Sequence, residues 1–393
     1  MSRKLKDLIS DIEGKIPLYE VFEEGFTPED IKAAVVEILS PYFMNKEILE
    51  KLAVNVLIPD VIEYSRIYNL EVPINALKYS HEVHYRALQA SEELSLETCA
   101  MWLLRINTSL SIIWSQYLLK IDQSDLDIYE FMHEVLRNIG SLLEGYLKPF
   151  LQELLQQSRI VRRKDSSKET IKKLTFGDVV NELDQLSNYE NLFSSHNIRI
   201  NQWRNIAYHH DARIENGKIV CTLRDKTKRV FTKEEFIHAA KELMNISSGF
   251  KLAYYFFLRD NLSKMISLNC LPEIKLRNGQ YALNIVSGMA SQGFKVIELT
   301  EYDQKIKLVI QDITNNEPDN RRIHTTQFVF VLWNNSNKTK STVVEYWEKD
   351  GTPNFRTSAS IDLLIRVENE DLSIPAVFEL LELEDLRRNV KIQ

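Results

Sequence analysis

Apolar residues recur every three or four positions along most of the chain up to Asn261, and this spacing places them on one face of an α-helix. The stretch from Phe26 to Leu39 shows how such a helix begins: Thr27 can cap it, Pro28 suits its first turn, and acidic residues follow. The same spacing recurs at residues 48–57, 74–94 and 96–119. We therefore expect residues 1–124 to form a helical domain, whose role the residues do not indicate.

A second helical region is predicted after Ser124 and Asp125, which can cap a helix. A broad apolar face then extends from Leu126 to Leu155, as is typical of a helix that packs on a core or on a partner. A basic, serine-containing connector follows it. Beyond the connector, the spacing predicts a shorter helix from about Phe176 to Leu192.

The same region carries a predicted β-hairpin and a closing helix. Asn216 and Gly217 tolerate positive φ and lie between short runs of alternating apolar and polar residues, which predicts a hairpin turn. Thr232 and Glu235 have the spacing of a capping box. We expect a long helix from this box to near Asn261, so that residues 125–265 form a helical bundle with a β-hairpin insertion.

The pattern changes in residues 266–393, which are rich in Val, Ile, Thr and aromatic residues. Four strands are predicted there, at residues 295–300, 305–313, 325–333 and 342–347, with a turn at Asp350-Gly351. Helices are predicted before and after them, at residues 279–294 and about 361–386. The chain is therefore expected to be mainly α and to end in an α+β domain, to which we assign a regulatory or sensing role.

The chain has no apolar stretch of the roughly 18 residues that a transmembrane helix needs. The nearest candidate, Met101 to Trp114, contains Arg105 and Asn107. The N-terminal residues MSRKLKDLIS lack the apolar region of a signal peptide. These features predict a cytoplasmic protein that does not bind a membrane.

No metal or cofactor is expected. Cys99, Cys221 and Cys270 are odd in number and far apart, so they form neither a disulfide framework nor a metal-binding pair. His81 and His84 lie three positions apart, whereas the histidines of a zinc protease helix lie four apart and need a further ligand.

The charge is distributed unevenly. The whole chain has a formal charge of −7, but residues 159–233 hold 16 Lys and Arg against 9 Asp and Glu, a balance of +7. A local basic surface in an acidic protein can steer a polyanion to one place. Solvated helix faces and hairpin tips are the alternative explanation for such a cluster.

The residues with the clearest chemistry lie between Trp203 and His210, in the order WRNIAYHH. His209 can transfer a proton near neutral pH, Arg204 can hold phosphate oxygens, and Asn205 can orient the histidine or bind the substrate. RNA cleavage needs little more than these functions, because the nucleophile is the 2′-hydroxyl of the substrate itself. The segment therefore predicts a metal-independent ribonuclease site.

Helix geometry constrains how this site can be assembled. Asn205 and His209 share one face of a regular helix, whereas Arg204 and His209 differ by about 140° around the axis. Arg204 reaches His209 if it lies in an irregular first turn or if its long side chain swings across. Alternatively, two copies of the motif meet across a dimer with a shared two-fold site.

The motif and the elements predicted around it resemble the HEPN superfamily. Their order is a long apolar helix, a shorter helix, the motif helix, an Asn-Gly hairpin and a closing helix, across about residues 125–265. HEPN domains are small helical bundles with an Arg-x4–6-His motif, in which the residue after the arginine is usually polar. The resemblance implies an endoribonuclease that acts as a homodimer or higher homo-oligomer. It also implies a role in antiviral defence, abortive infection or toxin-like cleavage, and 2′,3′-cyclic phosphate and 5′-hydroxyl products.

By this motif, Arg204, Asn205 and His209 are the expected catalytic residues, and Tyr208 and His210 are accessory candidates. RNA is the expected substrate, and a regulatory partner or a phage trigger is a further candidate ligand. Cations of the basic segment are candidates for binding RNA: Arg162, Arg163, Lys164, Arg213 and Arg224.

The alternative function is a non-catalytic scaffold that binds RNA or a partner protein. Aromatic residues of the predicted C-terminal strands could then stack on bases. These residues are Phe328, Phe330, Trp333, Tyr346 and Trp347. Aromatic side chains at alternating strand positions are more often part of a core, so we expect them to be buried.

Overall fold

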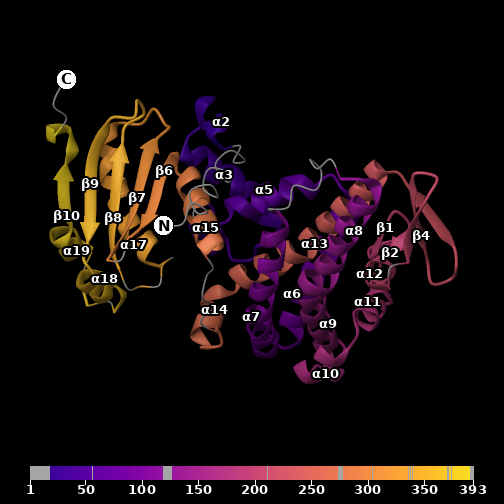
Figure 1. Cartoon of the computed structure of the whole chain (residues 1–393). Helices are drawn as coiled ribbons and strands as arrows, with labels where there is room; N and C mark the ends of the chain where they lie inside the picture. Colours follow the sequence, from indigo (N-terminus) through magenta and orange to yellow (C-terminus); the bar gives the residue numbers. More distant parts are fainter. Residues whose placement is uncertain are drawn as a thin grey trace. The chain divides into compact units, whose positions relative to one another are not determined.

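The computed structural model describes residues 18–54, 56–117, 126–209, 211–272, 278–302, 304–334, 336, 338, 340–369, 371–372 and 374–389. The fold is mostly helical and α+β overall, with a five-stranded sheet near the C-terminus (Figure 1). The chain divides into two compact units. A helical unit comprises Ser40–Ile48 and Asp60–Ile274, and a sheet unit comprises Met1–Leu39, Leu49–Pro59 and Lys275–Gln393.

Long helices dominate the helical unit. Its larger helices are α6 (Glu71–Ala90), α7 (Glu92–Tyr117), α8 (Ile128–Gly140), α9 (Lys148–Val161) and α13 (Lys233–Asp260). The shorter ones are η1 (Ser40–Tyr42), α10 (Lys168–Lys173), α11 (Phe176–Asp184), α12 (Ile200–His209) and α14 (Leu262–Ser267). The residues of α4 (Lys46–Leu52) and α5 (Ile58–Ile67) are divided between the two units.

One hydrophobic core joins α6 and α7 to α8, α9, α11, α12 and α13. The predicted boundary near residue 124 therefore falls between helices that share this core. The predicted cap at Ser124-Asp125 lies outside the described residues, and Asp127 caps α8 instead, accepting from the N–H groups of Tyr129 and Glu130. Helices α6 and α13 approach closely because Gly249 has no side chain: a Cβ there would lie 2.3 Å from the carbonyl oxygen of Pro73.

The predicted capping box and hairpin are confirmed. Thr232 and Glu235 form the reciprocal bonds of a capping box at the start of α13, which ends at Asp260. The hairpin joins β3 (Ala212–Glu215) to β4 (Lys218–Thr222), and its turn residues Asn216 and Gly217 have φ of 51° and 71°. A third strand, β5 (Lys228–Phe231), pairs with β4 and was not predicted. A small hairpin, β1 (Ser194–Ser195) and β2 (Ile198–Arg199), leads directly into α12.

The sheet unit contains strands in the spatial order β10-β9-β8-β7-β6. Their bounds are β6 (Phe294–Glu301), β7 (Lys305–Asp312), β8 (Ser341–Trp347), β9 (Pro353–Ala359) and β10 (Glu382–Asp385). Strands β7 and β8 pair in parallel, and the other neighbours are antiparallel. The helices of this unit are α2 (Leu18–Glu23), α3 (Pro28–Leu39), α15 (Asn278–Ala290), α16 (Pro318–Thr325), α17 (Phe328–Asn334), α18 (Ile361–Glu368), α19 (Ile374–Leu380) and η4 (Leu386–Asn389).

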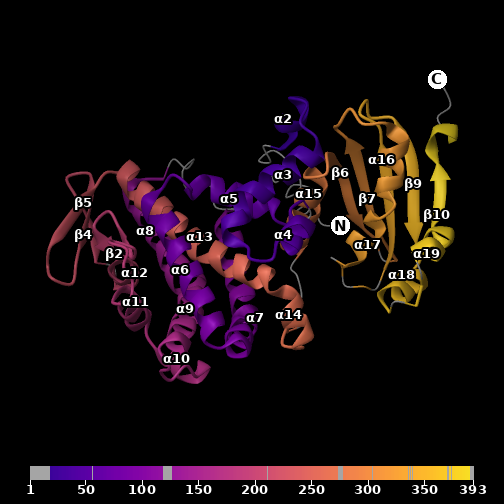
Figure 2. The ribbon, with the colours of Figure 1, turned by 180° about the vertical axis from the view of Figure 1, so that it is seen from behind.

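One prediction for this unit was wrong, and another was confirmed only in part. The strand predicted at residues 325–333 is the end of α16 followed by α17 (Figure 2). A short apolar run has no clear period, and here it forms a buried helix against the sheet rather than a strand in it. The final predicted helical section, residues 361–386, is confirmed by α18 and α19 but ends in the edge strand β10, which pairs with β9.

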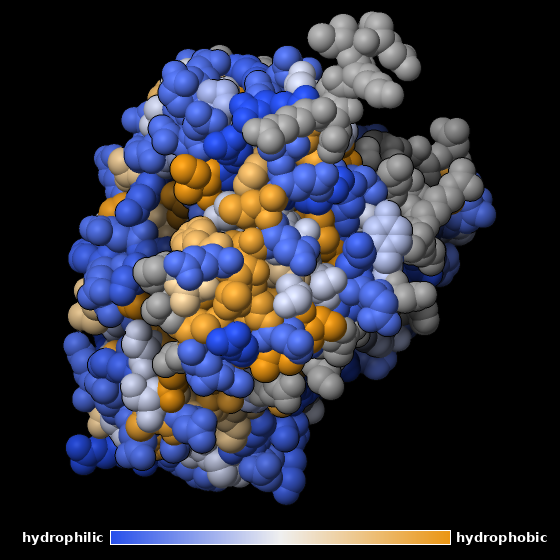
Figure 3. Space-filling model, turned by 90° about the vertical axis from the view of Figure 1, so that its left-hand side faces the viewer, coloured by the Kyte–Doolittle hydropathy of each residue, from blue (hydrophilic) through white to orange (hydrophobic). Residues whose placement is uncertain are grey.

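Of the five aromatic residues expected to be buried, Phe328, Trp333 and Tyr346 lie in the core of the sheet unit, whereas Phe330 and Trp347 are partly exposed. Apolar side chains also gather on the face of the molecule to which β10 and α19 belong (Figure 3). The exposed ones there include Phe378, Leu380 and Leu383. None of the helices in the described part of the chain has the length and apolar character that crossing a bilayer requires.

Candidate functional site

Helix α12 carries the predicted motif and is anchored by its apolar side. Trp203 and Ile206 are buried, and the indole Nε1 of Trp203 donates to the carbonyl oxygen of Ser195, 3.1 Å away. With that side fixed against the core, Asn205 and His209 lie along the part of the helix surface next to Ile206. Their spacing of one helical turn was predicted, and it places them on one pocket.

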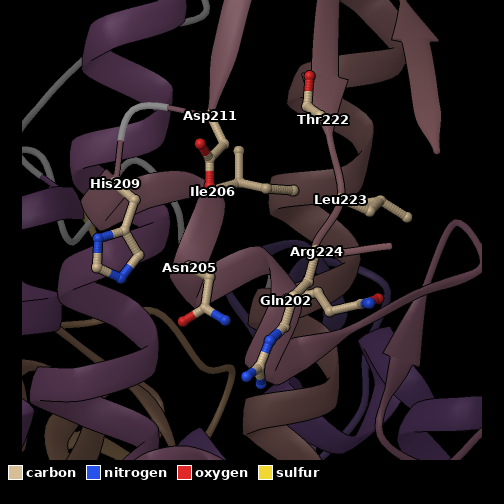
Figure 4. Close-up of a pocket in the computed structure, with 8 residues that line it drawn as sticks. All are labelled: Gln202, Asn205, Ile206, His209, Asp211, Thr222, Leu223 and Arg224. Atoms are coloured by element: carbon tan, nitrogen blue, oxygen red, sulfur yellow. The ribbon is translucent and has the colours of Figure 1, made fainter. Parts of the chain in front are cut away.

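The pocket has a volume of about 260 Å³ and lies between α12 and the end of the hairpin insertion (Figure 4). Its lining residues are Gln202, Asn205, Ile206, His209, Asp211, Thr222, Leu223 and Arg224. The N–H of Thr222 donates to the carbonyl oxygen of Asp211, 2.7 Å away, and this bond closes the base of the hairpin beside α12. The hairpin therefore forms half of the surface that His209 faces.

Arg204 does not line this pocket. It lies in the second turn of α12, and its Nε donates to Oε1 of Glu144, 2.8 Å away. The guanidinium carbon lies 4.9 Å from the centre of the Tyr208 ring, and Nη1 donates to the side-chain oxygen of Asn205 at 3.3 Å. Within one chain, neither an irregular first turn nor a side chain that swings across brings Arg204 to His209.

Glu144 comes from an irregular turn in a long helix. Residues Ser141–Leu147 form a π-helical segment, η3, between α8 and α9, and such segments are frequent at functional sites. Glu144 also accepts from Nζ of Lys148, 2.9 Å away, and its side chain is only 19% exposed. A carboxylate shared by two cations holds the Arg204 guanidinium in one orientation. Sequence analysis missed this residue, because an (i, i+4) Glu-Lys pair is a common surface feature of helices.

The accessory candidates differ in position. Tyr208 stacks on Arg204, and its hydroxyl lies 3.5 Å from the carbonyl oxygen of Gly140 as a donor. A Cβ at Gly140 would lie 3.2 Å from the Tyr208 ring, so the glycine permits this contact. His210 lies outside the described residues.

The five candidate RNA-binding cations do not gather at one place. Arg162 is paired with Glu182, and Arg213 is paired with Glu215. Arg162 and Lys164 line a different depression, together with three carboxylates, Asp165, Asp178 and Glu182. Arg163, next to them in sequence, follows the end of α9 with a positive φ of 52°. Only Arg224 lies on the same pocket as His209.

Other titratable residues of the helical unit have partners of their own. His84 is buried and its Nε2 lies 2.9 Å from Oε2 of Glu153. His196 pairs with Glu242 on α13 at 2.8 Å. In the part of the chain that the structure describes, no three or more His, Cys, Asp or Glu side chains are grouped so as to hold a metal ion. Burial raises the pKa of the Cys221 thiol to about 12, so this cysteine is an inert core residue.

Comparison of the chain with models of protein families, with curated proteins and with solved structures finds no match. The chemistry of the site therefore rests on the residues themselves. The imidazole of His209, the side-chain amides of Asn205 and Gln202 and the exposed guanidinium of Arg224 surround one pocket of about 260 Å³. Arg204, on the same helix as Asn205 and His209, is held outside the pocket by Glu144.

Proposed function

We propose that this protein is a metal-independent endoribonuclease of HEPN type. The observation that carries the proposal is that His209 and Asn205 face one pocket on the surface of a segment with a net charge of +7. His209 is exposed, and no hydrogen bond or ion pair of its side chain is recorded among the described residues. An imidazole in this position is available to exchange protons with a bound substrate.

The proposed reaction uses the RNA as its own nucleophile. The 2′-oxygen bonds to the adjacent phosphorus as its proton passes to His209, and the bond from phosphorus to the 5′-oxygen breaks. The 5′-oxygen takes up a proton from water and His209 returns its proton to the solvent, so that the products are a 2′,3′-cyclic phosphate and a 5′-hydroxyl. Asn205 lies one turn from His209 and orients the substrate or the imidazole. The guanidinium of Arg204 stabilises the charge of the pentacovalent phosphorus.

The position of Arg204 supports a homodimeric form of this site. Arg204 and His209 lie on different sides of α12 in one chain, and Glu144 holds Arg204 away from the pocket. Two copies related by a two-fold axis would offer an arginine from one chain to the histidine of the other. Antiviral defence, the setting that the resemblance implies, stays a prediction.

A cleavage assay on total cellular RNA in the presence of EDTA tests the proposal. We expect wild-type protein to cut RNA, and His209→Ala to lose at least about 100-fold in rate, because general acid–base catalysis contributes about that much. Arg204→Ala should lose about as much. His133→Ala, which removes an exposed histidine of α8 outside the pocket, is the matched control and should cut like wild type.

The outcomes separate an enzyme from a scaffold. No cutting by wild type, together with RNA binding that His209→Ala leaves unchanged, would favour the non-catalytic alternative. Cutting that survives His209→Ala would place the chemistry elsewhere and end the proposal.

A further inference from the structure

Arg224 stands out among the cations of the basic segment. It follows strand β4, is exposed, and lines the pocket together with Asn205 and His209. The Arg224 side chain makes no ion pair or hydrogen bond with the described residues. By contrast, Arg204, Arg213 and Arg162 each donate to a glutamate. A guanidinium without a carboxylate partner is available to bind phosphate oxygens in a bidentate manner.

The pocket separates its positive and negative ends. Figure 4 shows the Arg224 guanidinium on the side of the Asn205 amide, and the Asp211 carboxylate at the other end near Ile206. A phosphate bound by Arg224 would therefore lie away from Asp211. The carboxylate can then accept hydrogen bonds from amino or hydroxyl groups of the same ligand.

The rest of the lining suits the remainder of a nucleotide. Leu223 provides a small apolar surface for a base, with Ile206 behind it, while the Gln202 amide offers both a donor and an acceptor to the edge of the base. The volume of about 260 Å³ is below the roughly 300–1,000 Å³ of pockets that enclose a whole drug-sized ligand. The pocket is thus sized for a single unit of a polymer that continues beyond it.

We propose that this pocket binds one nucleotide of single-stranded RNA, with Arg224 on its phosphate and Gln202 and Asp211 on its polar base or sugar atoms. The inference deepens the proposed ribonuclease function by assigning its substrate-positioning element. On this view the hairpin insertion supplies the cation that Arg204, held by Glu144, does not supply within the same chain.

The test measures RNA binding apart from cleavage. His209→Ala protein is titrated into short fluorescent homopolymer RNAs at several salt concentrations, with and without Arg224→Gln. We expect Arg224→Gln to weaken binding about tenfold and to lower the slope of log affinity against log salt by about 0.7, the value for one phosphate contact of a single strand. Arg229→Gln is the control, because it removes an equal charge from an exposed position on β5 outside the pocket.

Gln202→Ala tests the contact with the base. We expect it to change the order of affinity among the four homopolymers without changing the salt slope. An equal loss for all four would overturn the assignment of Gln202 to the base edge.

The outcomes also separate this inference from the proposed function. If wild type cuts RNA and Arg224→Gln binds and cuts like Arg229→Gln, the inference fails and the ribonuclease stands. If wild type does not cut but binding depends on Arg224, the nucleotide site stands and the ribonuclease fails. If neither the wild type nor any variant binds RNA, the inference is overturned.

Discussion

Arg321 in the sheet unit and Arg224 in the helical unit have opposite surroundings. In the sheet unit, Arg321 is 6% exposed, and its Nε donates to Oδ2 of Asp312 at 2.8 Å. Its Nη2 donates to the carbonyl oxygen of Gln292 at 2.7 Å, and its guanidinium lies 3.7 Å from the centre of the Phe294 ring. In the helical unit, Arg224 is exposed beside a pocket with no recorded partner among the described residues. An arginine whose donors are used stabilises a fold, whereas one whose donors are free is available to a ligand.

The charged strand residues of the sheet unit follow the same rule. Glu345 on β8 accepts from both Lys307 on β7 and Arg356 on β9, and Arg356 also pairs with Glu384 on β10. These pairs link four neighbouring strands across one face of the sheet. The comparison therefore predicts that charge changes in the sheet unit alter stability, and that charge changes at the pocket alter activity.

The largest expected effect is on stability, from Arg321→Ala. Removing the guanidinium leaves the Asp312 carboxylate buried without its partner, which should lower the free energy of unfolding by about 3–5 kcal/mol. Denaturant unfolding of both proteins measures the difference. Arg322→Ala is the control, since its partner Asp319 is 75% exposed and such pairs contribute less than about 1 kcal/mol. Equal losses for the two variants would contradict the contrast between paired and available arginines.

A smaller effect is expected on activity from Glu144→Gln. The variant keeps the shape of the side chain but removes the charge that orients Arg204, so cleavage should fall about tenfold, equivalent to about 1.4 kcal/mol, with little change in unfolding. Steady-state kinetics should show the loss in kcat rather than in KM. Glu134→Gln, which removes the partner of Arg137 on an exposed face of α8, should leave cleavage unchanged. A faster Glu144→Gln protein would mean instead that Glu144 restrains Arg204.

Local signals in the sequence predicted the fold best where short-range chemistry decides it. The Thr232 capping box and the Asn216-Gly217 turn were predicted because both depend on neighbouring residues. Helix α17 was predicted as a strand, because Val and Phe favour strands and only the packing against the sheet selects the helix. Strand β10 was missed for a similar reason, since pairing with β9 is a contact distant in sequence.

The candidate site shows the same division. Asn205 and His209 were placed on one face from their spacing alone, because one helical turn separates them. Arg224 was among the predicted RNA-binding cations, but its place opposite His209 was not predicted. Glu144 and Thr222 come from other elements, and no residue near the motif indicates them. Helix periodicity locates the side chains of α12, but only the fold shows what lies opposite them.

A pH-dependent effect is expected from two neighbouring histidines of α6. Burial lowers the pKa of His84. The charge of the Glu153 carboxylate and its hydrogen bond to the imidazole outweigh this effect, so the pKa in the folded protein lies above the ordinary value. The stability that His84 contributes is therefore fully present below about pH 6.5 and is lost as the pH rises through the raised pKa. Burial lowers the pKa of His81, although its Nε2 donates to the carbonyl oxygen of Tyr42, so the stability that His81 contributes is lost as the pH falls.

Denaturant unfolding on both sides of about pH 6.5 measures these contributions. Wild type is compared with His84→Gln and with His81→Gln. Wild type should lose stability relative to His84→Gln above about pH 6.5, and relative to His81→Gln below it. Each variant serves as the control for the other, because the expected slopes have opposite signs. A constant difference at all pH values would show that folding changes the pKa of neither histidine.

The smallest expected effect is that of Gly140→Ala, which should slow cleavage slightly and leave the free energy of unfolding almost unchanged. Alanine favours a helix over glycine by about 0.5–1 kcal/mol, but the added Cβ would lie 3.2 Å from the Tyr208 ring. Because Tyr208 is 48% exposed, the ring can move aside, and the free energy of unfolding should change by less than about 1 kcal/mol. Movement of the ring removes the support under Arg204, so cleavage should fall by a few-fold, roughly the value of an exposed cation–π contact.

Gly177→Ala, which meets no atom closer than 3.8 Å in the first turn of α11, provides the comparison. If both glycine variants cut RNA equally well, the stacking of Arg204 on Tyr208 has no part in positioning the guanidinium.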